Sequence, residues 1–420
     1  MIGDGLAGVV LAREFHADVV GPLLSRAMPG LGYAAGRLGS GSDVLGLDDE
    51  MSRDHDWGCR LTLLVDEDAS DQVPRISRML EEELPERFGE FPVRFPVTWD
   101  SAVSHRVEVA TVADCAASRL GVDPTRGLSV LDWLSVTGQS VLEVTAGPVF
   151  TDRTRTLASV RSALTWYPPD VERYVLAAGW GRLCQLLPMV GRSAARGDEL
   201  GSRLLSAQLA GDVAWLAFAL SRRWAPYAKW RGTAFRSLPV AGRLAPLLDA
   251  AVAGGGADGG SGGSGGGGAG WRDRGDGAGS GDGAGGWRDR EGALAAACEV
   301  LLDIQRDRGL PAPAAAVIPF FSRPYCAVDG AVAEGLLAGI TDPDVARLPA
   351  MVGCIEQWVD SVEVLSSPGR RAALQAAYRA LAGLEAARVG DAITVDAWGF
   401  WASWGGTGTG SVIIGVLYAS

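Results

Sequence analysis

Residues 38–65 read LGSGSDVLGLDDEMSRDHDWGCRLTLLV, and the part from Asp54 to Val65 alternates in polarity for most of its length. The odd-numbered residues are mostly apolar, whereas Asp54 and Asp56 fall on the opposite, polar face. Alternation with a period of two predicts a half-buried strand. On such a strand both carboxylates project from one face, with Cα atoms roughly 7 Å apart.

Two carboxylates on one face suit hard cations, which prefer oxygen ligands. A pair of Mg²⁺ ions about 3.5–4 Å apart can stabilise both the attacking and the leaving oxygen of a phosphoryl displacement. Such a site usually takes a third carboxylate, and Glu108 is the candidate, because it lies on the polar face of a second alternating stretch, residues 105–112. We therefore expect Asp54, Asp56 and Glu108 to be catalytic residues and metal ligands. The alternatives are a solvated acidic loop continuing from residues 48–50 and, for Glu108, an exposed strand position.

A second group of candidates would bind phosphate. Gly39, Ser40, Gly41 and Ser42 are expected to open a short helix, where glycines let the backbone approach a phosphate and terminal amides bind anions. A plain turn is the alternative. Lys229 joins this nucleotide-binding set because it is the single lysine among 38 basic residues, and a compact ammonium suits a phosphate. Chance is the competing explanation for that lysine.

These motifs carry two resemblances. Gly39-Ser40, followed after thirteen residues by Asp54-His55-Asp56, resembles the signature of the DNA-polymerase-β-like nucleotidyltransferase superfamily, particularly its aminoglycoside and lincosamide nucleotidyltransferases. More closely, LGSGSDVLGLDDEMSRDHDWG, LEVTAGPVFTD, YAKWRGTAF and EQWVDSVEVLSSPGRR are similar to an uncharacterised bacterial family, domain-of-unknown-function family 4037. The resemblance implies an α+β fold, with a nucleotidyltransferase-like small mixed sheet and flanking helices, followed by an all-α helical bundle.

The chain is expected to have five parts. They are a nucleotidyltransferase-like domain (1–154), a helical bundle (155–250), a glycine-rich flexible insertion (251–290), a C-terminal helical region (291–385) and an unassigned tail (386–420). Within the first part, apolar spacing predicts helices over 5–28 and 71–84, the latter capped by Asp71, and a hairpin of 141–145 with 148–150. The tetrapeptide Trp-Arg-Asp-Arg occurs twice, at 271–274 and 287–290, and is interpreted as a duplication within the insertion.

Composition narrows the classes of function. The net charge of −12 argues against broad nucleic-acid binding. The six cysteines are scattered, without the spacing of a zinc site or a disulfide framework. The first residues lack the basic segment of a signal peptide, and no apolar run is long enough for a membrane span. We therefore expect a cytoplasmic protein with neither a nucleic-acid nor a membrane partner.

Together these inferences predict an Mg²⁺-dependent nucleotidyltransferase that uses ATP or another NTP. An acceptor hydroxyl or amine would attack the α-phosphate, and pyrophosphate would leave. The acceptor is an unknown small molecule, expected between the first domain and the bundle, because domain interfaces commonly form pockets. Two alternatives stay open. One is a non-catalytic nucleotide-binding or regulatory module, suggested by the arginine and histidine beside the aspartates, and the other is an enzyme that adenylylates a protein.

Overall fold

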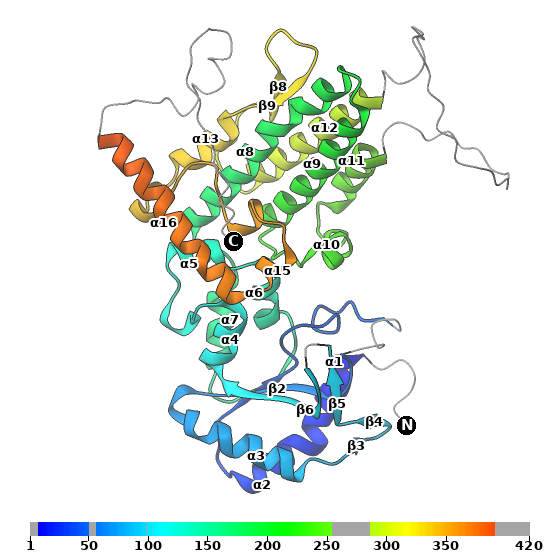
Figure 1. The fold of residues 1–420 in the computed structure, drawn as a ribbon, viewed down its shortest axis with the longest axis vertical. Helices are drawn as coiled ribbons and strands as arrows, with labels where there is room; N and C mark the ends of the chain where they lie inside the picture. The colour runs from blue at the N-terminus through cyan, green and yellow to red at the C-terminus, as the bar shows by residue number, and fades with distance from the viewer. Residues whose placement is uncertain (1–6, 50–55, 99, 254–285, 391–420) are drawn as a thin grey trace, which may run out of the picture.

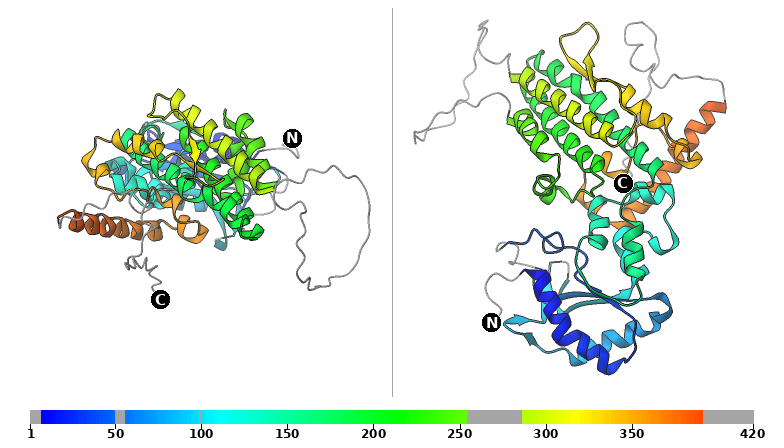
Figure 2. Two further views of the ribbon diagram at one scale, coloured as in Figure 1. Left: turned by 90° about the horizontal axis from the view of Figure 1, so that it is seen from above. Right: turned by 180° about the vertical axis from the view of Figure 1, so that it is seen from behind.

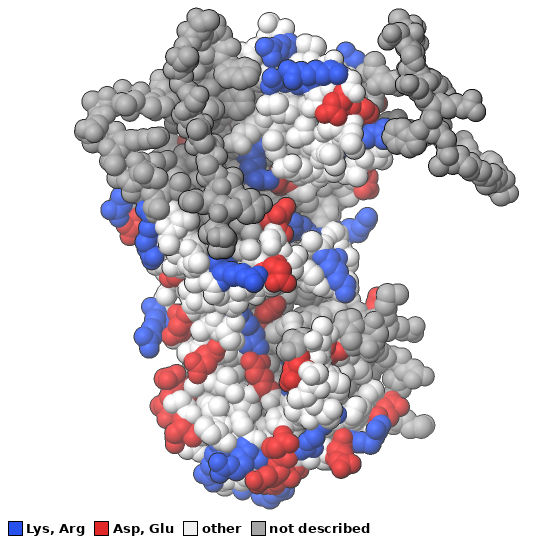
Figure 3. All heavy atoms as spheres, in the orientation of Figure 1, with Lys and Arg blue, Asp and Glu red and all other residues white. Residues whose placement is uncertain are grey.

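The computed structural model describes residues 7–49, 56–98, 100–253 and 286–390 (Figure 1). A mixed sheet with its helices forms one end of the molecule, and a larger group of helices forms the other (Figure 1). Among the described residues, no helix is both long and apolar enough to cross a membrane. Arginine and acidic side chains are interspersed over the face shown in Figure 3, without a broad basic area.

Five strands form the sheet in the order β5-β6-β2-β1-β7. Only β2 and β6 are parallel, and the other neighbouring pairs are antiparallel. This mixed sheet, followed by many helices, confirms the predicted α+β class. The strands are β1 (Ala34–Gly36), β2 (Arg60–Val65), β5 (Arg94–Val97), β6 (Asp100–Thr111) and β7 (Val149–Asp152), with a separate small hairpin of β3 (Arg87–Phe88) and β4 (Phe91–Pro92).

Both faces of β2 are covered. Leu61 and Leu63 belong to a core cluster with the N-terminal helices and α3 (Val73–Glu83), whereas Leu64 belongs to a second cluster on the opposite face. The predicted strand is therefore confirmed over Arg60–Val65, but its predicted half-burial is wrong, because Thr62 and Leu64 on the second face are buried as well. The strand does not reach back to Asp56, because Asp56 has φ +57° and Gly58 has φ +149°, and neither value fits an extended strand.

The predicted helix over 5–28 is confirmed for its described part. It consists of α1 (Gly8–Phe15), a π-helical turn η1 (His16–Val20) and α2 (Gly21–Ala27), which lie across one face of the sheet (Figure 2). The predicted helix over 71–84 is also confirmed, as α3. Asp71 does not cap it, because a 3₁₀ helix, η3 (Glu67–Gln72), runs directly into α3.

The predicted hairpin around Ala146-Gly147 is wrong. Residues 141–145 lie in helix α6 (Gly138–Thr145), and β7 pairs with β1 instead. Thr137 caps α6 by accepting a hydrogen bond from the Ser140 amide (3.1 Å), while the Ser140 hydroxyl accepts from the Thr137 amide (3.0 Å). These local bonds, and the burial of Val141 and Val144 on one helical face, outweigh the strand preference of the β-branched residues.

The sheet's second face is covered by helices. Core cluster residues from α4, α5, α6, α7 and α8 pack together there with Leu64. Thr111 ends β6 and caps α4 by accepting a hydrogen bond from the Asp114 amide (3.0 Å). The helices are α4 (Val112–Leu120), the 3₁₀ turn η4 (Pro124–Arg126), α5 (Val130–Ser135), α6 and α7 (Thr156–Ala163).

The helical pattern predicted from about residue 155 to residue 248 is confirmed. The main core cluster of this part is formed by α8 (Pro169–Ala194), α9 (Glu199–Leu220), α11 (Ala241–Ala253) and α12 (Gly286–Asp307), with α10 (Ala228–Phe235) at the edge. The second Trp-Arg-Asp-Arg copy opens α12, where Trp287 and Arg290 are buried. It therefore belongs to a packed helix rather than to the glycine-rich insertion, and the first copy lies outside the described residues.

The C-terminal part returns to the sheet domain. Helix α16 (Pro368–Gly390) begins beside α5 and α6 and runs along the molecule (Figure 1). Arg371 on α16 donates to the carbonyl of Arg119 on α4 (2.5 Å). Before α16 come β8 (Val317–Pro319), β9 (Cys326–Val328), α13 (Ala331–Ala338), α14 (Pro343–Ala346), the 3₁₀ turn η5 (Ile355–Gln357) and α15 (Val362–Leu365). Of the unassigned tail, residues 391–420 lie outside the described residues.

Candidate functional site

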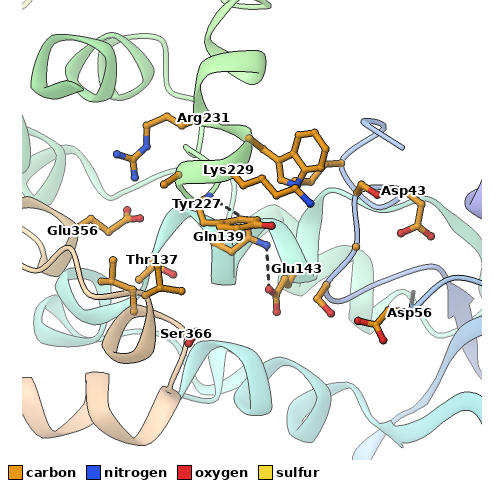
Figure 4. Close-up of a pocket in the computed structure, with 18 of the residues that line it drawn as sticks. Asp43, Asp56, Thr137, Gln139, Glu143, Tyr227, Lys229, Arg231, Glu356 and Ser366 are labelled. Atoms are coloured by element: carbon orange, nitrogen blue, oxygen red, sulfur yellow. Dashed lines mark hydrogen bonds between the residues drawn. The ribbon is translucent and has the colours of Figure 1, made fainter. Parts of the chain in front are cut away.

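A cavity of about 610 Å³ lies between the sheet domain and the helical part. This is the junction at which the sequence predicts the acceptor to bind. Its walls come from the loop after β1, the segment before β2, the start of α6, helix α10 and the residues around η5 and α15 (Figure 4). Segments more than 300 residues apart in the chain, from Ser40 to Ser366, therefore share one cavity.

The Gly39–Ser42 segment forms turns rather than the predicted helix. The amides of Leu45 and Leu47 both bond to the carbonyl of Ser42, at 3.1 and 2.8 Å. The reason is a buried ion pair, in which Arg37 Nε donates to Asp43 Oδ2 (2.7 Å) and Arg37 Nη2 to Asp43 Oδ1 (2.9 Å). The same guanidinium donates to the carbonyls of Leu38 (2.5 Å) and Ser40 (2.9 Å). Arg37 thus holds the loop open as a bend.

Two glycines of this loop are required by its geometry. Gly39 has φ +87° and Gly41 has φ +142°, a region that other residues rarely adopt. A Cβ at position 41 would overlap Asp43 Oδ1 and lie 2.6 Å from Arg37 Nη2. The amide of Gly39 donates to the carbonyl of Glu143 on α6 (2.7 Å), which ties the loop to the helical side of the cavity.

Asp56 lies on the cavity wall in a bend before β2, and Asp54 lies outside the described residues. Asp56 Oδ1 accepts a hydrogen bond from the Thr98 amide (2.5 Å), and Arg60 Nη1 donates to the Asp56 carbonyl (3.0 Å). The two bonds attach the bend to Arg60 of β2 and to Thr98 after β5. Asp56 is therefore placed by loop contacts rather than by the face of a strand.

Glu108 lies on β6, directly opposite Thr62 of β2 in the parallel register. The sequence left open whether these two strands are neighbours, and they are. Glu108 Oε2 accepts from Arg119 Nη2 on α4 (2.5 Å) and, more distantly, from Thr62 Oγ1 (3.4 Å). It lines a second cavity of about 400 Å³, which shares Ser40, Arg60 and Glu143 with the first.

Arg60 connects the two cavities electrostatically. Burial, together with the nearby charge of Arg37, lowers the pKa of Arg60 to about 9, against the opposing effect of the carboxylates of Asp43, Asp56 and Glu108. A pKa of about 9 keeps the guanidinium charged at neutral pH. The charges of Asp56 and Glu108 thus act on one half-buried cation.

Of the three predicted metal ligands, Asp56 and Glu108 belong to the described residues. Carboxylate oxygens of Asp56 and Glu108 are of the kind that Mg²⁺ prefers. Over the described ranges, however, no three Asp, Glu, His or Cys side chains gather closely enough to hold a metal ion. Glu108 is engaged by Arg119, and Asp56 by the Thr98 amide. The third predicted ligand, Asp54, lies outside the described residues, so the metal set stays a prediction.

Lys229 lines the same cavity as the Gly39–Ser42 loop and Asp56. Its ammonium lies 4.9 Å from the centre of the Trp230 ring and extends toward the Asp43 side of the cavity (Figure 4). In the described chain it makes no ion pair. Tyr227, 37% exposed, also lines the cavity and is not packed into the bundle.

Five further residues at or beside the cavities were not found from the sequence: Arg37, Asp43, Glu143, Arg231 and Glu356. Asp43 follows the Gly-Ser motif directly, so its position was a usable signal. Glu356 accepts a hydrogen bond from the Gly138 amide at the start of α6 (3.0 Å). No local pattern around Glu356 indicates that contact, because it joins residues 218 positions apart.

Comparison with known proteins supports one of the two resemblances directly. Residues 133–231 match the family described as "Domain of unknown function (DUF4037)". The match contains LEVTAGPVFTD and the beginning of YAKWRGTAF, including Lys229 and Arg231. The chain is thus similar to that family over α5, α6 and the helices up to α10.

Among solved structures, the chain is similar to a nucleotidyltransferase-like protein from Exiguobacterium sibiricum 255-15. The two sequences are 11% identical, the match covers 71% of this chain and 80% of that protein, and the TM-score is 0.30. A TM-score of this size does not establish a shared fold. Among curated proteins, none matches this chain.

Proposed function

We propose that the protein transfers a nucleoside monophosphate from ATP or another NTP to a hydroxyl or amine of a small molecule. The observation that carries the proposal is the convergence of Ser40–Ser42 of the loop, Asp56 and Lys229 on one cavity. Backbone amides beside glycines bind phosphate closely, and an ammonium compensates its charge. A cavity of about 610 Å³ falls within the range of ligand pockets.

In the proposed reaction the acceptor oxygen or nitrogen forms a bond to the α-phosphorus. The bond from that phosphorus to the bridging oxygen breaks, and pyrophosphate leaves with the electron pair. The Gly39–Ser42 loop and Lys229 would hold the triphosphate, so that the α-phosphorus faces the acceptor. The acceptor's proton would pass to Glu108 or to solvent.

The proposal also assigns Mg²⁺ to Asp54, Asp56 and Glu108. A bound divalent cation would supply charge compensation at the phosphates. Glu108 would first have to leave Arg119, which holds it at 2.5 Å. Titration calorimetry with MgCl₂ and the nucleotide tests this assignment, because Asp54→Ala and Glu108→Gln should each weaken Mg²⁺-dependent nucleotide binding.

The decisive experiment uses ATP labelled in its α-phosphate, with a panel of small alcohols and amines. Wild-type protein should transfer label and release pyrophosphate, and Asp54→Ala and Asp56→Asn should do neither. Asp68→Asn is the matched control, since Asp68 is exposed on η3 and lines neither cavity. Equal turnover by the wild type and by Asp56→Asn contradicts the proposal.

A second candidate is a module that binds a nucleotide without turning it over. The ion pair of Glu108 with Arg119 favours it, because a carboxylate committed to an arginine is not free for a metal or a proton. This candidate predicts calorimetric binding of ATP with no pyrophosphate release under any acceptor. Detected pyrophosphate that depends on Asp56 would exclude it.

A further inference from the structure

Helix α10 presents two cations to the cavity in opposite directions. Lys229 and Arg231 are two positions apart on the helix, so their side chains leave it on different sides. Lys229 extends toward the Asp43 side, and Arg231 extends toward Glu356 (Figure 4). The proposed function uses only the first of these cations.

Arg231 makes no hydrogen bond or ion pair in the part of the chain that the structure describes. It is half-buried, its Nε is fully enclosed without a hydrogen bond, and its guanidinium forms no ion pair there. Asp212 on α9 and Glu356 on η5 are near enough to interact with its charge electrostatically. Neither contacts it, since Asp212 is paired with Arg182 (3.2 Å) and Glu356 accepts from the Gly138 amide (3.0 Å).

A half-buried guanidinium without a hydrogen bond loses hydration, and the two nearby carboxylates replace it only through space. The group that best replaces it is a carboxylate or a phosphate, whose two oxygens match the fork of arginine. The segment that follows Glu356 adds Val359, Val362 and Leu365 to the cavity wall, together with Asp360 and Ser366. The Arg231 end of the cavity therefore combines one cation that lacks a hydrogen-bonded partner with three apolar side chains.

We propose that Arg231 binds an anionic group on the acceptor, so that the acceptor class is an apolar small molecule carrying a carboxylate or phosphate in addition to its reacting hydroxyl or amine. The inference rests on the proposed function, because only that function makes the bound molecule an acceptor. Binding of an anion at Arg231 can be measured without turnover. Lys229 then serves the nucleotide and Arg231 the acceptor, at opposite ends of one cavity.

The test measures binding of benzoate, phenyl phosphate and the neutral benzamide to the full chain by ligand-observed NMR. Benzoate or phenyl phosphate should bind the wild type more tightly than benzamide does, and whichever is tighter identifies the anion. Arg231→Gln should weaken binding of that anion by roughly tenfold or more, and Arg231→Lys should weaken it by less. Arg236→Gln, an exposed arginine just past the end of α10 that lines neither cavity, should change nothing.

ATP binding is measured in parallel by calorimetry, so that the two proposals can fail separately. Arg231→Gln should leave ATP affinity within about twofold of the wild type, while Lys229→Gln weakens it. Equal binding of the anions and benzamide, or anion binding that survives Arg231→Gln, overturns the subsite. Loss of ATP binding in Arg231→Gln also overturns it, because Arg231 would then serve the nucleotide. A wild type that binds the anions but not ATP refutes the proposed function and leaves the anion subsite standing.

Discussion

Arg37 and Asp43 form a two-point ion pair across the Gly39–Ser42 loop, with distances of 2.7 and 2.9 Å and side chains only 3% and 8% exposed. Removing one partner of a buried pair leaves the other charge without compensation. We expect Asp43→Asn to lower the free energy of unfolding by about 3 kcal/mol, measured by urea denaturation. Asp68→Asn, at an exposed site, should change it little. Equal stability of the two variants would show that the pair is not what holds the loop.

Gly41 should tolerate no side chain. Its φ of +142° and the overlap of a Cβ with Asp43 Oδ1 predict that Gly41→Ala costs about 2 kcal/mol. Gly211→Ala is the matched control, because a Cβ there meets nothing within 4 Å and the position lies in the middle of α9. Alanine in a helix interior is favoured over glycine by up to about 1 kcal/mol. Thermal melting should therefore move in opposite directions for the two variants.

Two substitutions distinguish a catalytic role of Glu108 from a structural role of its ion pair with Arg119. Glu108→Gln removes the carboxylate, and we expect nucleotidyl transfer to fall by about 100-fold or more if Glu108 takes part in proton transfer. Arg119→Gln releases the carboxylate from its ion pair but keeps it in place, so transfer should persist and Mg²⁺-dependent nucleotide binding should strengthen. Nucleotidyl-transfer assays of both variants at saturating ATP distinguish the two roles. Equal losses in the two variants would indicate that the pair only stabilises the fold.

Glu291 on α12 predicts a pH dependence of stability. Burial raises its pKa to about 7, although the Cys326 amide and Arg288 oppose the shift. Between its ordinary pKa of 4.5 and about 7, the folded protein keeps a proton that the unfolded chain has lost. Stability should therefore be greatest below the ordinary value and fall by up to about 3 kcal/mol as the pH rises to about 7.

The variant Glu291→Gln should remove this dependence, because a neutral amide has no proton to lose. At pH 8 it should be more stable than the wild type, and at pH 4.5 the difference should be small. Urea denaturation across this range gives the result, with Glu334→Gln, at an exposed position on α13, as the control. A parallel pH profile for wild type and Glu291→Gln would count against a proton retained at Glu291.

The sequence predicted the elements whose signal is local. Leu61 and Leu63 alternate with polar neighbours, and this period of two identified β2, while three- and four-residue spacing identified α3 and the long helices. Residues 141–145 were assigned wrongly because β-branched side chains suggest a strand, whereas the Thr137–Ser140 cap and burial of one face impose a helix. The positive φ angles at Asp56 and Gly58, which keep β2 from starting before Arg60, leave no trace in the polarity pattern.

The candidate site was predicted only in part, because only some of its features leave a local signal in the sequence. The glycines at 39 and 41 are needed where the motif placed them, yet the Arg37–Asp43 pair makes their segment a bend rather than a helix. The adjacency of β2 and β6, which brings Glu108 opposite Thr62, depends on strand order and was not deducible from spacing. Arg231 and Glu356 line the same cavity only because the chain returns to it after α12, a long-range property without a local pattern.

Helix α16 carries a consequence for shortened forms of this protein. Its Arg371 holds the carbonyl of Arg119, 252 positions earlier, and a Cβ at Gly121 would lie 3.1 Å from the carbonyl oxygen of Pro368. Arg119 in turn holds Glu108. A chain that ends before Pro368 would lose these contacts with α4, and Arg119 would be held less firmly. Deleting a helix that is distant in sequence would therefore weaken the contacts that position Glu108 on the sheet.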